Sequence, residues 1–400
     1  MHIENVGLGD LLNRPLKSGD HEMIRNHFTG KTILVSGAGG SIGSEICRQA
    51  AKFGVKKLIM VDASEFNLYQ VDLMIREFES RGLEVHSILQ SAADGVAMRR
   101  LFKSHRPDTV IHAAAFKHVP LVESNPIAGI TNNITSTITL AQAALDFNVG
   151  AFLLISSDKA VNPTNVMGLT KRCCELIIQA LDRSHPGRVR FMAVRFGNVL
   201  ASSGSVIPRF RQQIEAGGPV TVTHRDVTRY FMMIEEAVGL VLQSLSMADG
   251  GEVFVLNMGD PVRIYELAEK MILASGSQPH VDIKIEITGL RPGEKMYEEL
   301  ILAGDEFATE NGNIFVAIPE PIDPGNIMAS IRNLLDIASM GDAEACTKSL
   351  REIVYHRNAA STVIPFRVPR PAPKMDPLMP NVHTAHQTMA GTSESDMQAS

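Results

Sequence analysis

The sequence predicts an α/β fold in which a doubly wound parallel sheet carries a smaller C-terminal substrate-binding lobe. From Lys31 onward, six short apolar runs alternate with amphipathic helical segments. That alternation is typical of a parallel sheet covered by helices on both faces. The first run leads directly into a glycine-rich loop at residues 37–43, which is typical of the Rossmann-type arrangement.

Each expected element follows from a local pattern. Strands are expected at 32–36, 57–62, 84–89, 109–114, 152–156 and 190–196. The helix expected between the first two strands, 41–53, places Ile42, Ile46 and Ala50 on one face and ends before Gly54, which suits the position after a helix C-terminus. Further helices are expected at 68–78, 98–105, 127–147, 168–181, 264–275 and 327–338.

The domain organisation follows from shifts in composition along the chain. Residues 1–30 are polar and mixed and form an N-terminal arm, and 31–200 contain the regular alternation. Residues 201–355 are less regular and richer in Pro and Gly, so they are expected mainly to form the smaller lobe. Residues 366–400 hold five prolines followed by a Ser/Thr/Gln/Met-rich end, which predicts a disordered tail.

The composition excludes several classes of function. The chain has 400 residues, a net charge of -6, no Trp and only 5 Tyr. Nucleic-acid binding is not expected, because it needs clustered cations and stacking aromatics. The sequence lacks a signal peptide and a long apolar segment, so a cytoplasmic protein without a membrane span is expected. The four cysteines lack metal-ligand spacing, so no metal is predicted.

The glycine loop predicts a dinucleotide site. Gly37 permits the tight turn after the strand, Gly40 lets the backbone approach a pyrophosphate, and Gly43 lets the helix pack close to the sheet. Ser41 and Ile42 begin that helix, whose N-terminus attracts phosphate. Asp62 ends the second strand, where its carboxylate would bind ribose hydroxyls and repel a 2′-phosphate. NAD is therefore favoured over NADP as the cofactor.

A second polar cluster follows the fifth strand, where Ser157, Asp158 and Lys159 stand in sequence. They would emerge at the carboxyl edge of the sheet, where ligands bind in open α/β folds. Asp158 and Lys159 form either a solvated ion pair on a loop or an acid and a base acting on one substrate. Met167 and Lys171 are spaced to share one helix face, and Met167 cannot transfer a proton.

Several motifs together resemble the nucleotide-sugar 4,6-dehydratases of bacterial polysaccharide biosynthesis, the CapD-like family within the extended short-chain dehydrogenase/reductase superfamily. The resemblance covers about residues 9 to 302. Its motifs are GDLLNRPL (9–16), SGAGGSIGSEICRQ (36–49), HAAAFKHVPLVESNP (112–126), SSDKAVNPTNVMGLTKR (156–172), VRFGNVLASSGSVIPRF (194–210), VTRYFMMIEEAV (227–238) and GLRPGEKMYEEL (289–300).

The resemblance implies a lyase that dehydrates a UDP-sugar, most simply UDP-N-acetylglucosamine, to a 4-keto-6-deoxy sugar. In that family bound NAD oxidises the C4 hydroxyl, water leaves from C6, and the hydride returns to C6. By motif position Asp158 would be the acid and Lys159 the base, Ser157 would bond the C4 oxygen, and Lys171 would hold the nicotinamide ribose. Met167 stands where the superfamily usually has Tyr, so the group that takes the C4 proton stays open.

The resemblance also assigns the remaining binding positions. Ala113 and Ala114 would contact the cofactor, and Ser91 stands where the family usually has an adenine-binding Asp. The substrate residues would be Lys117 and His118 near the sugar, the helix residue Asn133, Asn198, Arg229 and Arg291 at the diphosphate, and Glu294 at the uridine ribose. For Asn133, hydrogen bonding inside a core helix is the alternative.

Two other functions share this fold. A UDP-sugar 4-epimerase or simple oxidoreductase would normally need Tyr at position 167 and has no use for Asp158-Lys159. A non-catalytic NAD-binding protein would keep the glycine loop and Asp62 but lose the acid/base pair. A homo-oligomer, dimer or higher, is expected, with the helices at 127–147 and 168–181 as the candidate interface. The C5 stereochemistry, exact sugar and end product stay open.

Overall fold

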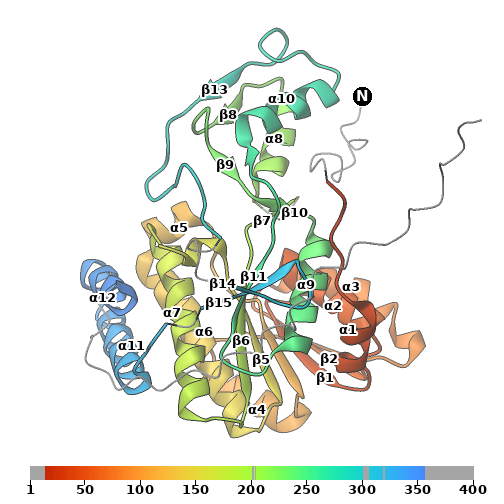
Figure 1. Ribbon diagram of the computed structural model, residues 1–400, viewed down its shortest axis with the longest axis vertical. Helices are drawn as coiled ribbons and strands as arrows, with labels where there is room; N and C mark the ends of the chain where they lie inside the picture. Colours follow the sequence, from red (N-terminus) through yellow and green to blue (C-terminus); the bar gives the residue numbers. More distant parts are fainter. Residues whose placement is uncertain (1–13, 201, 203, 301–305, 319, 356–400) are drawn as a thin grey trace, which may run out of the picture.

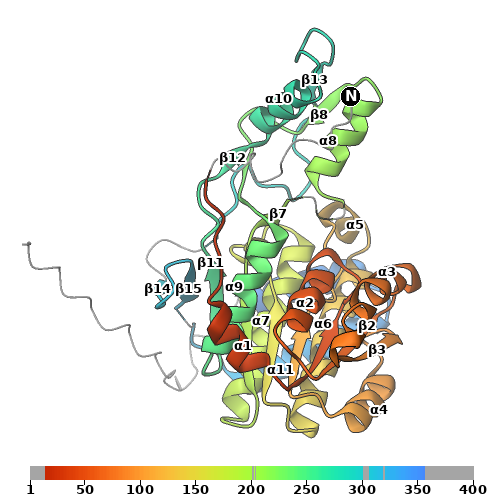
Figure 2. The same ribbon diagram turned by 90° about the vertical axis from the view of Figure 1, so that its right-hand side faces the viewer.

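The computed structural model describes residues 14–355 apart from 201, 203, 301–305 and 319. A sheet covered by helices on both faces forms the main body, and a smaller lobe stands at one end of it (Figures 1 and 2). The predicted fold class is confirmed. The predicted tail at 366–400 lies outside the described residues.

The main sheet has nine strands in the order β14-β15-β11-β6-β5-β4-β1-β2-β3. All neighbours from β11 to β3 are parallel, and β15 and β14 extend the β11 edge antiparallel. The chain runs outward from β1 to β3 and then restarts at β4 on the other side of β1, so the topological switch lies between β1 and β4. The bounds are β1 Thr32–Ser36, β2 Lys57–Asp62, β3 Glu84–Leu89, β4 Thr109–His112, β5 Ala151–Ile155, β6 Arg190–Arg195, β11 Val253–Leu256, β14 Glu306–Ala308 and β15 Ile314–Ala317.

Two separate hydrophobic cores fill the space between the sheet and its helices. One core joins the sheet to α1 (His21–Phe28), α2 (Ser41–Lys52), α3 (Glu65–Arg76) and α9 (Ile234–Met247). The other joins it to α4 (Gly95–His105), α6 (Pro126–Asp146), α7 (Val166–Ser184), α11 (Pro324–Ser339) and α12 (Ala343–Tyr355). The strands are therefore apolar on both faces, which explains their continuous hydrophobic runs.

The small lobe has a third core of its own. It contains α8 (Val206–Glu215), α10 (Ile264–Ala274), β8 (Val220–Val222) and β13 (Ile285–Ile287), and β9 (Thr228–Arg229) pairs there with β12 (Val262–Arg263). Two short strands, β7 (Asn198–Val199) and β10 (Phe231–Met232), pair where the chain enters and leaves the lobe (Figure 1). Residues 201–355 are thus divided, because α9, β11, β14, β15, α11 and α12 return to the main body.

All six predicted strands form, with ends within two residues of the expected ones. The N-terminal arm differs from its prediction, because α1 lies within it. Asp20 caps this helix by accepting from the backbone N–H of Glu22 and Met23, and Ile24 and Phe28 are fully buried. Two apolar residues one turn apart in a polar segment are a weak signal in sequence, and tertiary packing makes the helix stable.

The helix pair predicted as an oligomer interface is covered by the same chain. Residues Val166 to Leu181 of α7 are all buried, and α11 and α12 pack against α7 and α6 (Figure 1). At the end of α12, Tyr355 Oη donates a hydrogen bond to Pro163 O at 2.5 Å. The expected interface on these helices is therefore occupied from within the chain.

The burial of Phe28 makes α1 part of the core. Phe28→Ala should lower the free energy of unfolding by about 3–5 kcal/mol, because it leaves a cavity against α9. Phe66→Ala is the matched control, since Phe66 is 71% exposed, and should change it by less than about 0.5 kcal/mol. Urea denaturation measures both, and equal effects would contradict the docking of α1.

Candidate active site

The carboxyl ends of β1, β4, β5 and β6 open into a cavity of about 680 Å³. This size suits a cofactor or a drug-sized ligand. The cavity lies at the topological switch, where open α/β sheets bind ligands. All five predicted catalytic residues line it, namely Ser157, Asp158, Lys159, Met167 and Lys171, together with Gly37, Gly40, Ser41, Ile42 and Gly43 of the glycine loop.

The glycine loop is too tight for side chains at Gly37, Gly39 and Gly43. Gly37 has φ of +66°, and a Cβ there would lie 2.6 Å from the backbone nitrogen of Ala114. A Cβ on Gly43 would lie 2.0 Å from the carbonyl oxygen of Gly37. The backbone at the start of α2 therefore faces the cavity without a covering side chain, and the first turn of α2 carries no acidic residue. This geometry fits a phosphate group of a dinucleotide.

The other predicted cofactor residues lie around this loop. Asp62 accepts hydrogen bonds from the backbone N–H of Gly39 at 2.9 Å and of Ser64 at 2.8 Å. Its carboxylate therefore borders the glycine loop, although Asp62 does not line the cavity. Ala113 lines the cavity, and Ala114 packs against Gly37. Ser91 accepts from the backbone N–H of Ala93 at 3.2 Å and does not line the cavity.

A buried ion cluster anchors the end of β5. Glu175 on α7 is 0% exposed and accepts from Ser156 Oγ at 2.6 Å. Arg195 on β6 binds both its oxygens, at 2.8 and 2.6 Å, and Arg172 binds Oε2 at 2.8 Å. Burial alone would raise the pKa of Glu175, but the two arginines outweigh it and lower the pKa to about 2. The residue before Ser157 is thus held by charged hydrogen bonds.

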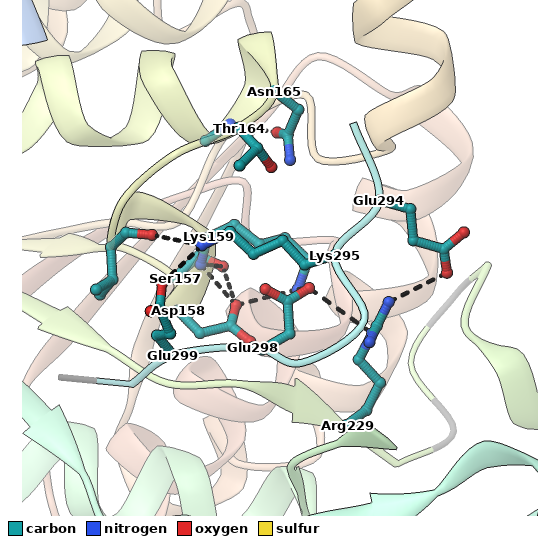
Figure 3. A network of polar contacts seen from close by, with 12 residues as sticks. Ser157, Asp158, Lys159, Thr164, Asn165, Arg229, Glu294, Lys295, Glu298 and Glu299 are labelled. Atoms are coloured by element: carbon teal, nitrogen blue, oxygen red, sulfur yellow. Dashed lines mark hydrogen bonds and ion pairs between the residues drawn. The ribbon is translucent and has the colours of Figure 1, made fainter. Parts of the chain in front are cut away.

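Ser157, Asp158 and Lys159 form one hydrogen-bonded unit at the cavity wall (Figure 3). Ser157 Oγ donates to Asp158 Oδ1 at 2.7 Å, and Lys159 Nζ contacts the same oxygen at 3.1 Å. Asp158 Oδ2 is buried and has no hydrogen-bond partner among the described residues. A buried polar atom without a partner is uncommon in folded proteins, so this oxygen is available to accept a hydrogen bond from a ligand in the cavity.

A third carboxylate, which the sequence interpretation did not assign, completes this cluster. Glu298 Oε1 lies 3.4 Å from Lys159 Nζ and 3.7 Å from Arg229 Nε. Burial lowers the pKa of Lys159, but Asp158 and Glu298 outweigh that effect and raise it above its usual value. Lys159 is therefore held as an ammonium ion in this arrangement.

Met167 and Lys171 lie on α7, which begins after Asn165, whose side chain caps the helix at the Gly168 N–H. Lys171 Nζ donates to the carbonyl oxygen of Ile155 at 2.6 Å, and burial lowers the pKa of Lys171. Met167 is 3% exposed and lines the cavity one turn away. The cavity wall thus carries the Lys171 amine and, one turn before it, the Met167 thioether, which cannot carry a proton.

The predicted substrate residues fall into three groups. Lys117 and His118 line the main cavity, and burial lowers the pKa of both. Asn133 does not line it: it is 1% exposed, accepts from Phe116 N at 2.7 Å and donates to Phe116 O and Thr170 Oγ1. Both ends of its amide are therefore bonded inside the core, where Asn133 connects α6 to Phe116 in the loop after β4 and to Thr170 on α7.

The third group lines a second cavity of about 210 Å³ in the small lobe. Asn198 lines both cavities, and Arg229, Arg291 and Glu294 line the second. Arg229 binds Glu294 Oε1 at 3.1 Å, and the backbone N–H of Arg291 donates to Glu294 Oε2 at 3.2 Å. Two arginines in the second cavity, which shares Asn198 with the main one, suit a phosphate group.

Two other features bear on the sequence predictions. Within residues 14–355, where described, no group of three or more His, Cys, Asp or Glu side chains is placed to hold a metal ion. In the same part of the chain, none of the helices has the length and apolar character needed to cross a bilayer. The four cysteines are free and buried.

The residue that sequence reasoning missed is Glu298. It lies inside a motif that was identified, GLRPGEKMYEEL, but it stands next to a second glutamate. Glu298 is 8% exposed, whereas Glu299 is exposed to solvent and pairs with Lys295. Only the fold distinguishes them, because the segment lacks the helical or strand period that would predict which side faces inward.

Comparison with known proteins finds similarity to polysaccharide biosynthesis proteins. The family described as polysaccharide biosynthesis protein matches residues 33–319. The capsular polysaccharide biosynthesis protein CapD of Staphylococcus aureus is 49% identical over 300 residues, covering 75% of this chain and 50% of that protein. The chain therefore spans about half the length of that relative.

More distant relatives carry two different names. A UDP-glucose 4-epimerase of Rickettsia conorii is 32% identical, covering 73% of this chain and 84% of that protein. An inverting UDP-N-acetylglucosamine 4,6-dehydratase of Campylobacter jejuni is 30% identical, covering 74% of this chain and 84% of that protein. The solved structure of Pen from Bacillus thuringiensis superposes with a TM-score of 0.67 at 32% identity, covering 74% of this chain and 89% of that one.

The buried Glu175 cluster gives a pH-dependent stability. Glu175→Gln should lower the free energy of unfolding at pH 7 by about 3 kcal/mol or more, because it leaves the buried Arg195 without its anion and Arg172 with Glu320 alone. The depressed pKa contributes stability above 4.5, which is lost as the pH falls from 4.5 toward 2. Urea denaturation between pH 7 and 4 should therefore show the difference from the unmodified protein shrinking with acid. A constant difference would contradict the ion pairing.

Proposed function

The chain belongs to the polysaccharide biosynthesis protein family, and from this membership and its site we propose that it is an NAD-dependent 4,6-dehydratase of a UDP-sugar. The proposed substrate is UDP-N-acetylglucosamine, giving a UDP-4-keto-6-deoxy-N-acetylhexosamine for a surface glycan. One observation carries the proposal: an acid and a base, Asp158 and Lys159, share a wall of the cavity that also holds the glycine loop.

The main body would bind the cofactor. The start of α2 and the loop at Gly37 would hold its pyrophosphate, and Asp62 its adenosine ribose. Lys171 on α7 would face the nicotinamide ribose. When bound, NAD would supply a reversible oxidation, removing two electrons at sugar C4 and returning them at C6.

The small lobe would bind the nucleotide part of the substrate. Arg229, Arg291 and Asn198 would contact the diphosphate, and Glu294 the uridine ribose. Lys117 and His118 line the main cavity and would contact the sugar. Because Asn198 borders both cavities, a diphosphate beside it would direct the sugar toward Asp158.

The C4 hydroxyl proton would pass through Ser157 to Asp158. This path is needed because Met167 cannot accept a proton. Ser157 Oγ would accept the C4 hydroxyl proton while passing its own to Asp158 Oδ1, 2.7 Å away. Asp158 would then give that proton to the C6 hydroxyl, which leaves as water. One proton is thereby taken from the C4 hydroxyl and delivered to the leaving hydroxyl at C6.

Lys159 would take the C5 proton, for which it must be neutral. Protonation of Asp158 removes one of the two negative charges that hold Lys159 as an ammonium ion, so the first step would lower the pKa of the base needed in the second. After water leaves, C5 would regain a proton from Lys159 or from solvent.

The alternative is a UDP-sugar 4-epimerase, the activity named for one relative. An epimerase removes a hydride from C4 and a proton from the C4 hydroxyl, returns both, and leaves C5 and C6 untouched, so it has no use for a second acid/base residue. Asp158 and Lys159, both at the cavity and hydrogen-bonded to each other, favour elimination. A non-catalytic NAD-binding protein is disfavoured for the same reason.

The proposed function is tested by incubating the purified chain with UDP-N-acetylglucosamine and NAD in deuterated water and following the product by NMR. A 4-keto-6-deoxy sugar with deuterium at C5 is expected, and the C5 configuration reports retention or inversion. Conversion to the C4 epimer with C6 unchanged would show an epimerase instead. Unchanged substrate with bound NAD would exclude both enzymes.

Lys159→Ala should abolish deuterium exchange at C5, with at least a hundredfold loss of turnover, while NAD binding is retained. Lys270→Ala is the control, because Lys270 is exposed on α10 and should leave turnover unchanged. Normal C5 exchange in the Lys159 variant would remove Lys159 as the base.

A further inference from the structure

Glu298 bridges the two parts of the site. It lies on the segment that runs from β13 in the small lobe back to the main body (Figure 1). Its side chain is 4% exposed, and Oε1 lies between Lys159 Nζ at 3.4 Å and Arg229 Nε at 3.7 Å (Figure 3). One buried carboxylate therefore contacts the predicted base and a predicted phosphate ligand.

The backbone around Glu298 is fixed on both sides. Thr164 Oγ1 and Asn165 Nδ2 each donate to Gly293 O at 3.2 Å, and Lys295 Nζ donates to Val161 O at 3.1 Å. On the lobe side, Met296 O accepts from Thr228 N and from Arg229, both at 3.2 Å. These bonds tie the segment to the loop that follows Lys159 and to β9, so the position of Glu298 is set by five contacts outside its own side chain.

The charges around Lys159 come from every element near it. Asp158 is its sequence neighbour, Glu298 approaches from the segment after β13, and Arg229 from β9. Lys117, His118 and Lys171 line the same cavity. Glu298 is thus the one anion near Lys159 that is not itself proposed to accept and release a proton, among the described residues.

We propose that Glu298 is a positioning residue, which holds the Lys159 side chain at the cavity wall in its ammonium form and sets the pH at which it becomes a base. The catalytic consequence rests on the dehydratase function proposed above, whereas the effect on Lys159 does not. In the unliganded site Glu298 and Asp158 together oppose the burial that would otherwise neutralise Lys159.

The direct test compares Glu298→Gln with Glu299→Gln, measuring how acetic anhydride acetylates Lys159 as a function of pH, by mass spectrometry and without substrate. Lys159 is 20% exposed, and only the neutral amine reacts. In Glu298→Gln the midpoint of labelling should move to lower pH, so that labelling at a fixed pH below it rises several-fold, since each pKa unit changes the neutral fraction about tenfold. Glu299→Gln should label as the unmodified protein does.

Glu298→Asp keeps the charge on a shorter side chain and should give an intermediate midpoint; it also serves if the glutamine variant fails to fold, as judged by thermal melting. An unchanged midpoint in the folded Glu298 variants, or an equal shift in Glu299→Gln, overturns the proposal. With substrate, the rise of turnover with pH should move to lower pH in Glu298→Gln alone. A labelling shift in a protein without dehydratase activity would sink the proposed function and leave the positioning role standing.

Discussion

The site depends on one buried ion cluster, in which Glu175 joins α7, β6 and the end of β5. Ser156, Arg172 and Arg195 all bond to this carboxylate. Charges buried at this depth are stable only as a complete set, because removing one partner leaves the others uncompensated. The cluster therefore fixes where β5 ends, and the next residues along the chain are Ser157, Asp158 and Lys159.

In the proposed dehydratase, the arrangement beyond that point would compensate for the methionine at position 167. A tyrosine there would carry the first proton from a helix. Here the groups that can carry protons follow directly from a strand, and Ser157, Asp158 and Lys159 are already hydrogen-bonded to one another. Each protonation step changes the charge felt by the next group.

The sequence predicts the features that depend on local pattern and fails where distant segments meet. Continuous apolar runs and the glycine loop predict six strands and the cofactor side of the cavity, because both patterns are confined to a few neighbouring residues. The three strands at one side of the sheet, β11, β15 and β14, were not expected, since they are short and two of them run antiparallel to their neighbours. Asn133 and Glu298 show the same limit, because whether a polar residue faces a cavity or a core depends on segments distant in sequence. Glu298, for example, contacts Lys159, which lies more than a hundred residues before it.

The hydrogen bond from Tyr355 to Pro163 connects the C-terminal helices to the loop that borders the candidate site. Pro163 lies in the loop between Lys159 and the start of α7, and α11 and α12 pack along α7 itself. The helix that carries Lys171 is thus braced from outside by the last helices of the described chain. Substitutions in α11 or α12 would therefore alter how firmly α7 and the loop at Pro163 are held, although neither helix lines the cavity.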